Sequence, residues 1–273
     1  MISPQELPNY KLNRPNSKVW DTHSGECLHT LQHSHIVRAI AFPSQPRPQI
    51  LATGGFEKKL RIFDLSRSTS NGSGENSASS SPTSPIQNGS TTTPPPPPSH
   101  EIGPGVHQGP IKSIVWGPDL NIIITASDDR TVRWWDLRSR TPVSSYSLAA
   151  PVGSCELDSF SSTPSLSIAA GKNAYFFSGT TPGQLLKSVK FETEIASVAM
   201  HAEQRKFVTG GAGDTWVRVY DFDGEGEMEV HKGHHGPIWS VSFAPDGKLY
   251  ATGSEDGTVK LWKFCSEPYG LWR

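Results

Sequence analysis

The most constraining feature of the sequence is a short motif, an aromatic residue usually followed by aspartate, that recurs at an almost fixed interval. The aromatic residues of the motif are Trp20, Phe63, Trp135, Phe177, Tyr220 and Trp262. Successive copies lie 42 or 43 residues apart, except that 72 residues separate Phe63 from Trp135. The longer interval contains a Ser- and Pro-rich insertion. A period of roughly 40–45 residues is typical of tandem units of four strands each, so the chain is predicted to be a repeat protein.

Each repeated unit is predicted to consist of β-strands. In the last copy, IWSVSF alternates apolar and polar residues, and the turn-forming segments APDGK and EDG separate it from LYATGS and TVKLW. No segment shows convincing helical periodicity. A single four-stranded sheet cannot bury both of its faces, whereas radially packed sheets cover one another. The fold class is therefore all-β and the architecture a β-propeller. A two-sheet sandwich is the alternative, and it gives no reason for a fixed period.

Five complete four-stranded units are expected, after a partial unit made of VWD and ECLHTL. In the first complete unit, strands are expected over 36–42, 50–54 and 60–64. Corresponding triplets are expected at 111–136, 152–178, 195–221 and 238–263, with fourth strands near 100–106, 143–148, 184–190, 227–231 and 267–272. The missing half of the partial unit predicts an incomplete, open ring, with exposed sheet faces at its two ends.

The chain is expected to divide into four segments. Residues 1–17 are a non-propeller segment, residues 18–65 the partial blade and the first full blade, and residues 100–273 the remaining blades. Residues 66–99 consist almost entirely of Ser, Thr, Pro, Gly and Asn. Such a composition buries too little apolar surface to offset the entropy lost on ordering, so this insertion is predicted to be disordered. Its run Pro94–Pro98 is interpreted as a linker, with a ligand for an SH3 or WW domain as the alternative.

The charge and cysteine content restrict the classes of partner. The 25 basic and 26 acidic residues give a net charge of −1, so no general attraction to nucleic acid or to anionic membranes is expected. No apolar run approaches membrane-spanning length, and the first residues lack the apolar core of a secretory signal. Three widely separated cysteines indicate a reducing compartment. The cytoplasm and the nucleus are the expected locations.

The last unit carries a resemblance to a known family. GHHGPIWSVSFAPDGKLYATGSEDGTVKLW, followed by EPYGLWR, resembles the WD40-repeat family, and in particular its serine-threonine kinase receptor-associated branch. Subunit i of translation initiation factor 3 is the nearest rival. The resemblance implies a seven-bladed ring, which this chain contains in truncated form, and a scaffold that joins proteins without catalysis. It further implies association with the survival-of-motor-neuron complex in spliceosomal assembly, with an RNA-binding translation regulator, or with receptor-kinase signalling.

Two sets of polar residues recur at the same places in their units. They are His107, Thr125, Asp129 and Trp135, and His234, Thr252, Asp256 and Trp262. In the WD40 family, residues at these positions form a structural hydrogen-bond chain, and the resemblance implies the same role here. A unique active site would not recur, which argues against catalysis. A decayed copy is expected at His35, Thr53, Glu57 and Phe63, and a further remnant at Thr209, Asp214 and Tyr220.

Other candidate sites have weaker patterns. Cys27, His29, His33 and His35 are dense enough to suggest zinc, but their spacing fits no standard zinc site. The segment GAGDTW lacks the third glycine of a dinucleotide fingerprint and precedes a strand. No catalytic residue, cofactor, metal or small-molecule substrate is therefore expected.

One basic position recurs two residues before the aromatic residue of four units. It is occupied by Arg61, Arg133, Arg218 and Lys260. These side chains are either solvated or form a basic band that binds acidic protein or RNA. Two functions therefore stand against each other, a protein-interaction scaffold and an RNA-binding propeller. The near-neutral charge favours the scaffold, with RNA reached indirectly through its partners.

Overall fold

The computed structural model describes residues 16–66, 97–158 and 161–265. Over these ranges the backbone forms strands β1 to β21, arranged in six antiparallel sheets, and no helix. The strands follow chain order within every sheet, so each sheet is a simple meander. The predicted all-β fold class is confirmed. No helix of the described ranges is long and apolar enough to cross a membrane.

The sheets, called blades here, repeat the same succession of strands. Blade 1 consists of β3 (Val37–Ala41), β4 (Ile50–Gly55), β5 (Leu60–Asp64) and β6 (Ser99–Ile102). Blade 2 consists of β7 (Ile111–Trp116), β8 (Ile122–Ser127), β9 (Thr131–Asp136) and β10 (Thr141–Ser147). Blade 3 consists of β11 (Val152–Asp158), β12 (Ser165–Ala170), β13 (Asn173–Ser178) and β14 (Leu185–Lys190).

Blade 4 is again four-stranded, whereas the sheets at the two ends of the molecule have fewer described strands. Blade 4 consists of β15 (Ile195–His201), β16 (Lys206–Gly211), β17 (Val217–Asp221) and β18 (Glu227–His231). Blade 5 consists of β19 (Ile238–Phe243), β20 (Leu249–Ser254) and β21 (Val259–Lys263). β1 (Asn16–Trp20) pairs with β2 (Cys27–Gln32) in a two-stranded sheet before blade 1. The fourth strand expected at 267–272 lies outside the described residues.

Two boundaries of the predicted segments are wrong. β1 begins at Asn16, inside the segment assigned as non-propeller, because Asn16 and Ser17 pair with Gln32 and Leu31. β6 begins at Ser99, inside the predicted insertion, and ends at Ile102, four residues before the expected end. The strand stops there because Gly103 adopts a φ of +56° and packs against the ring of Trp135. The rest of the predicted insertion, apart from 66, 97 and 98, lies outside the described residues.

The blades pack face to face through side chains that alternate along each strand. Trp134 faces blade 3, where its ring centroid lies 5.2 Å from that of Phe177, whereas the adjacent Trp135 belongs to the core between blades 1 and 2. Phe176 likewise faces blade 4 and lies 5.0 Å from Phe207. Successive side chains of a strand point to opposite faces, so each aromatic pair serves two interfaces.

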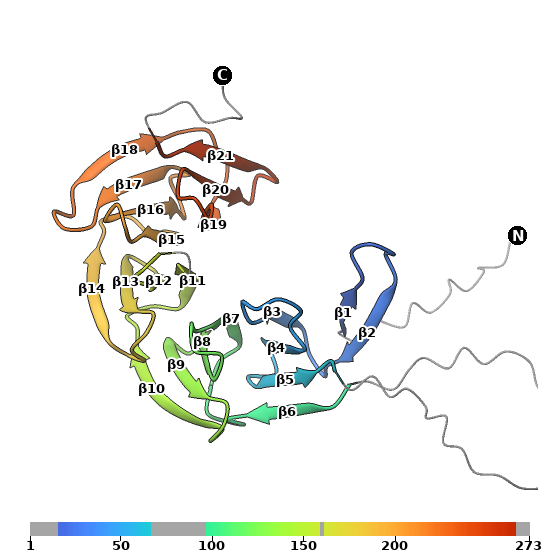
Figure 1. The fold of residues 1–273 in the computed structure, drawn as a ribbon. Helices are drawn as coiled ribbons and strands as arrows, with labels where there is room; N and C mark the ends of the chain where they lie inside the picture. The colour runs from blue at the N-terminus through green and yellow to red at the C-terminus, as the bar shows by residue number, and fades with distance from the viewer. Residues whose placement is uncertain (1–15, 67–96, 159–160, 266–273) are drawn as a thin grey trace, which may run out of the picture.

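The sheets follow one another around an open arc, from the β1–β2 sheet to blade 5 (Figure 1). The innermost strands are β3, β7, β11, β15 and β19. The two end faces remain uncovered by described residues. Val259 and Leu261 of β21 are 73% and 50% exposed, whereas Val132 and Trp134, their counterparts in blade 2, are buried. The arc is the open arrangement that the sequence predicts, and the fold places apolar side chains on its terminal faces.

Candidate functional site

The first recurring set of polar residues forms one hydrogen-bonded network in blade 2. His107 Nδ1 lies 2.9 Å from Asp129 Oδ2, and His107 Nε2 lies 2.8 Å from Thr125 Oγ1. Trp135 Nε1 donates to the same Thr125 oxygen at 2.8 Å. Because a carboxylate only accepts hydrogen bonds, Nδ1 carries the proton in the neutral ring and Nε2 accepts from the threonine hydroxyl. The network therefore connects the loop before β7 to β8, to the turn after it, and to β9.

Blade 5 contains a second network with the same connectivity. His234 Nδ1 lies 3.1 Å from Asp256 Oδ2, and His234 Nε2 lies 2.7 Å from Thr252 Oγ1. Trp262 Nε1 donates to Thr252 Oγ1 at 2.8 Å. The structure thus brings together all four members of each predicted set. The networks lie beside the first residues of the innermost strands β7 and β19, so both are at the same rim of the arc of blades.

Each network also contains a threonine that the predicted sets lack. Thr131 Oγ1 donates to Asp129 Oδ1 at 2.6 Å, and Thr258 Oγ1 donates to Asp256 Oδ1 at 2.7 Å. The backbone N–H of each threonine donates to the same carboxylate oxygen. The signal was present in the sequence as a threonine two residues after the aspartate, in DRT and DGT.

These contacts fix the charge state of the networks. Burial by itself raises the pKa of Asp129, but hydrogen bonds from Thr131 and His107 outweigh it and hold that pKa at about 2. Hydrogen bonds, led by the one from Thr258, keep the pKa of Asp256 well below its ordinary value. Burial lowers the pKa of His107. At neutral pH the blade 2 network therefore combines an ionised carboxylate with a neutral imidazole.

The prediction that His35 belongs to the decayed network of blade 1 is wrong. His35 is exposed, and the buried ring is that of His33, whose Nδ1 lies 3.9 Å from Glu57 Oε1. His33 occupies the slot because it stands four residues before the first residue of β3, as His107 and His234 stand before β7 and β19. That constant offset is the signal that identifies it.

The blade 1 network is incomplete for a second reason. Phe63 packs edge-on against His33 but has no indole N–H. His33 Nε2 lies 3.4 Å from Ser17 Oγ instead of contacting Thr53. The hydroxyl of Thr53 is therefore buried without a hydrogen-bond partner. In blade 4, the remnant aspartate Asp214 forms an ion pair at 2.5 Å with Arg218.

The recurring basic positions make local contacts in the structure. Arg61 forms ion pairs with Glu57 at 2.7 Å and Glu101 at 3.2 Å. Arg218 lies 3.2 Å from Glu227, in addition to its pair with Asp214. Arg133 Nε donates to Thr131 Oγ1 at 3.2 Å, and Lys260 is half-buried. Carboxylates thus neutralise two of the four cations, which disfavours a continuous basic surface.

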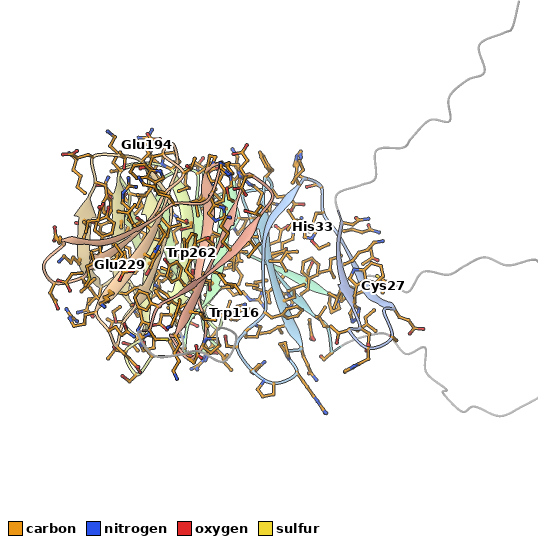
Figure 2. All side chains as sticks on the ribbon, turned by 90° about the horizontal axis from the view of Figure 1, so that it is seen from above. Cys27, His33, Trp116, Glu194, Glu229 and Trp262 are labelled. Atoms are coloured by element: carbon orange, nitrogen blue, oxygen red, sulfur yellow. The ribbon has the colours of Figure 1, made fainter. Side chains whose placement is uncertain are left out.

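The candidate zinc ligands do not converge on one point. Cys27 Sγ contacts His29 O and Thr30 Oγ1, while His33 belongs to the blade 1 network. Figure 2 shows Cys27 and His33 at separate places on the sheet at one end of the arc. Within the described ranges, no group of three His, Cys, Asp or Glu side chains is arranged to hold a metal ion.

One rim of the molecule, on the side of the networks, presents exposed large side chains. This network-side rim is defined by Arg38, Phe56 and Trp239, all of which are exposed. Trp239 is 49% exposed, and its Nε1 donates to Glu255 Oε2 at 3.3 Å. Arg38 lies over the ring of Phe56 and forms a 3.1 Å ion pair with Asp128 of the next blade. Tryptophan and arginine side chains of this kind dominate binding energy at protein interfaces.

The repeats match a known domain model. Residues 25–64, 104–136 and 227–263 match the WD domain, G-beta repeat, and each match ends at the aromatic motif of its blade. A chain titled "Crystal Structure of Mitotic Checkpoint Complex" superposes with a TM-score of 0.68 at 17% identity, over 92% of this chain and 68% of that one. Together with the radial blades and the repeated networks, these matches define a WD40-repeat propeller.

Curated relatives identify the branch of that class. The serine-threonine kinase receptor-associated protein of Gallus gallus is 37% identical over 94% of this chain, and that of Dictyostelium discoideum is 34% identical over 90% of this chain and 72% of its own length. The chain belongs to the serine-threonine kinase receptor-associated family of WD40-repeat proteins. Translation initiation factor 3 subunit I of Culex quinquefasciatus is 27% identical over 93% of this chain. The chain spans 63% of the length of the vertebrate relatives it matches.

Proposed function

We propose that this chain is a non-catalytic scaffold that holds protein partners together. The observation that carries the proposal is that the histidine–aspartate network occurs in two blades. In both blades the His, Asp and Thr side chains form the same structural hydrogen bonds. A buried polar network that is fully hydrogen-bonded fixes a single loop geometry. Large side chains of the network-side rim, Trp239 and Phe56 among them, are left exposed for contacts with partners.

The family relationship suggests which assemblies these are. The relatives are named as receptor-associated proteins. We propose that the chain works in receptor-kinase signalling or in a ribonucleoprotein-assembly complex of the survival-of-motor-neuron type, with roles in mRNA splicing and processing, in the cytoplasm and the nucleus. RNA is then reached through the protein partners, in keeping with the neutralised basic positions. A scaffold like subunit I of translation initiation factor 3 is the second candidate, favoured by the match over 93% of this chain.

Affinity purification of the tagged full chain, followed by mass spectrometry, tests the proposal. The purification is carried out with and without ribonuclease. The proposal predicts a defined set of proteins that stays bound after ribonuclease treatment. Ribonucleoprotein-assembly proteins, receptor kinases or translation initiation subunits in that set distinguish the candidate assemblies. Loss of all partners after ribonuclease treatment, with direct binding of the pure chain to single-stranded RNA, contradicts the scaffold and favours the RNA-binding alternative.

A further inference from the structure

Strand β1 has a free edge in the described part of the chain. It pairs with β2 on one side, as β5 pairs with β6 in blade 1. In blade 1 a further strand, β4, pairs with the inner edge of β5. β1 is the counterpart of β5, because both carry the aromatic motif near their ends, at Trp20 and Phe63. No described strand pairs with the inner edge of β1, which leaves a row of backbone N–H and C=O groups open to another strand.

The part of blade 1 beside this edge is apolar and uncovered. Ile40 of β3 pairs with Thr53, and the residues that pair with the equivalent threonines of blades 2, 4 and 5 are Ile114, Val198 and Val241. Those three side chains are buried in the cores that their blades share with the preceding blade. Ile40 is instead 52% exposed. β1 and β2 therefore leave uncovered a position that a preceding blade covers elsewhere.

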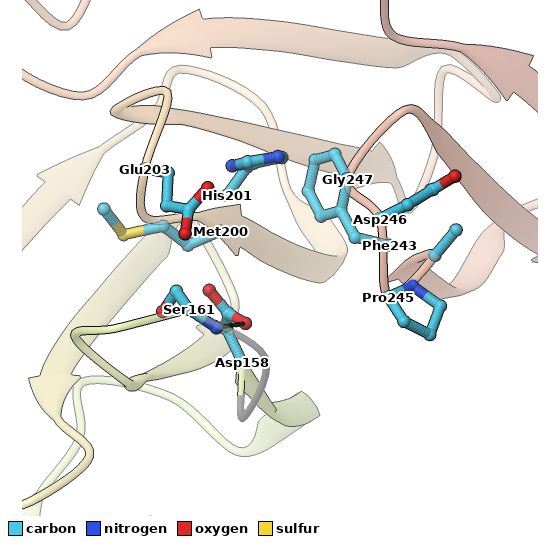
Figure 3. A pocket seen from close by; sticks show the side chains of 10 residues that line it. Asp158, Ser161, Met200, His201, Glu203, Phe243, Pro245, Asp246 and Gly247 are labelled. Carbon is cyan, nitrogen blue, oxygen red and sulfur yellow. Dashed lines mark hydrogen bonds between the residues drawn. The ribbon is translucent and has the colours of Figure 1, made fainter.

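Phe42, directly after β3, shows the same difference. It lies five residues after Val37, the first residue of β3, and its counterpart Phe243 lies five residues after the first residue of β19. Figure 3 shows Phe243 beside His201 of blade 4, and 5.3 Å separate the two ring centroids. Phe42 is exposed. The inner half of blade 1 thus carries the side chains of a blade–blade interface without a described neighbour.

The free edge and the apolar side chains border one groove of about 690 Å³. Residues 16–18 of β1 line one side of it, and residues 34–37 with Ile40 line the other. None of the described residues that line it is aspartate or glutamate. Lys18 is exposed, and its Nζ lies 5.4 Å from the centroid of the Trp20 ring. The groove therefore favours an extended apolar segment that also carries a negative charge.

We propose that the inner edge of β1 binds an extended strand of a partner protein by antiparallel pairing, an inference that rests on the scaffold function proposed above. The incoming backbone pairs with β1 as β4 pairs with β5. Val19 packs toward blade 1, so Lys18 points to the opposite face of its strand. Alternate side chains of the partner strand are then apolar and cover Ile40. A side chain between them is acidic and lies opposite Lys18, because opposite charges across strands stabilise the pair.

The first residues of the chain itself do not have this chemistry. Prolines at positions 4, 8 and 15 leave residues 9–14 as the longest stretch free of proline. Only Pro15 joins that stretch to β1, and even the shortest common hairpin turn has two residues. The stretch contains Lys11 and Arg14 and no acidic residue. We therefore assign the edge to a separate protein.

A capped peptide, Thr-Ile-Glu-Val-Thr-Ile-Thr, is the probe, and a matched peptide has Lys in place of Glu. Hydrogen–deuterium exchange of the full chain, read by mass spectrometry, locates the bound peptide. We expect slower exchange within residues 16–20 and unchanged exchange in β9, an interior strand. Methyl groups on one alternate set of the peptide amides should abolish binding, and methyl groups on the other set should not. The reason is that successive N–H groups point to opposite edges of a strand.

Two substitutions test the assigned side chains. Ile40→Ser should weaken peptide binding about tenfold, because it removes apolar surface that the strand would cover. Val143→Ser is the matched control, since Val143 is 53% exposed on β10 of blade 2. Lys18→Glu should reverse the preference from the Glu peptide to the Lys peptide. Thermal melting checks the folding of all variants, and the exposure of Lys18 and Ile40 predicts melting like the wild type.

Several results overturn the strand site. They include unchanged exchange in residues 16–20, equal binding of the two methylated peptides, and full binding by the folded Ile40→Ser variant. Slow exchange of residues 16–20 in the free chain, made fast by deletion of residues 1–15, would assign the edge to the chain's own start. A dimer that Ile40→Ser dissociates, measured by light scattering, would assign it to a second copy.

The strand site and the scaffold function can fail separately. If affinity purification recovers ribonuclease-resistant partners while the peptide does not bind, the strand site alone fails. If no protein partners are recovered, the scaffold function fails, whatever the peptide does.

Discussion

Trp135 Nε1 and His107 Nε2 meet at the same oxygen, Thr125 Oγ1, each at 2.8 Å, although the three residues come from different segments of blade 2. The threonine hydroxyl accepts from the indole and donates to the imidazole, which satisfies all three buried groups. The equivalent atoms of blade 5 meet in the same way. Such a network is stabilising when complete, and it is costly when one member is removed.

Removal of the network carboxylate should destabilise the fold. Asp129→Ala leaves the His107 Nδ1–H and the Thr131 donors without their partner. We expect the free energy of unfolding to fall by about 1–3 kcal/mol, the usual cost of an unsatisfied buried group. Urea denaturation measures the change. Asp119→Ala, in an exposed turn before β8, is the control and should have a much smaller effect. Equal losses in the two variants would contradict the structural role.

Restoring the missing indole should stabilise blade 1. Phe63→Trp places an N–H donor where the hydroxyl of Thr53 is buried without a partner. We expect a gain of about 1 kcal/mol in unfolding free energy, the net worth of one hydrogen bond. Thermal and urea unfolding measure it, and Thr53→Val in the same background should abolish it. A tryptophan variant that is less stable than the wild type would show that blade 1 cannot accommodate the larger ring.

The glycine that ends β6 should be intolerant of a side chain. A Cβ at Gly103 would lie 2.3 Å from two ring atoms of Trp135, and the residue has a φ of +56°. Gly103→Ala should therefore cost both backbone strain and core distortion. Gly105→Ala is a matched control, because Gly105 has a φ of +75° but no neighbouring atom within 4 Å of a Cβ. The melting temperature should be highest for the wild type, lower for Gly105→Ala and lowest for Gly103→Ala. Coincident values for the two variants would exclude the contact with Trp135 as a cause.

The buried Glu156 should make stability depend on pH. Its pKa is about 8 in the folded protein because of burial, against 4.5 ordinarily. Unfolding therefore releases a proton between these values, and the stabilising contribution is full below about pH 4.5 and lost as the pH rises through about 8. Glu156→Gln removes the titration while its amide oxygen still accepts from Ser242. Urea unfolding over this range should show wild-type stability falling relative to the variant. Parallel pH profiles would contradict the assignment.

Much of the architecture could be predicted because its cause is local. The strand alternation and turn residues recur in every unit, so the 42-residue period locates the blades, and the four-residue sets locate both complete networks. The strand ends were less predictable, since β6 stops where Gly103 meets Trp135 from another blade. His35 is the predicted histidine of the blade 1 network, but the buried one is His33, two residues earlier, and only its four-residue offset from β3 identifies it.

We infer that the networks stabilise the blades, whereas exposed side chains of the network-side rim bind partners. Trp239→Ala removes a half-exposed indole of the network-side rim and should leave the melting temperature nearly unchanged. Asp129→Ala should lower it without removing any side chain of that rim.

Quantitative co-purification of ribonuclease-resistant partners, at equal amounts of folded protein and below the melting temperature of every variant, compares the two most directly. We predict that Trp239→Ala loses these partners and that Asp129→Ala retains them. Retention by Trp239→Ala together with loss from a folded Asp129→Ala would contradict this prediction and would make the network a binding or reactive site.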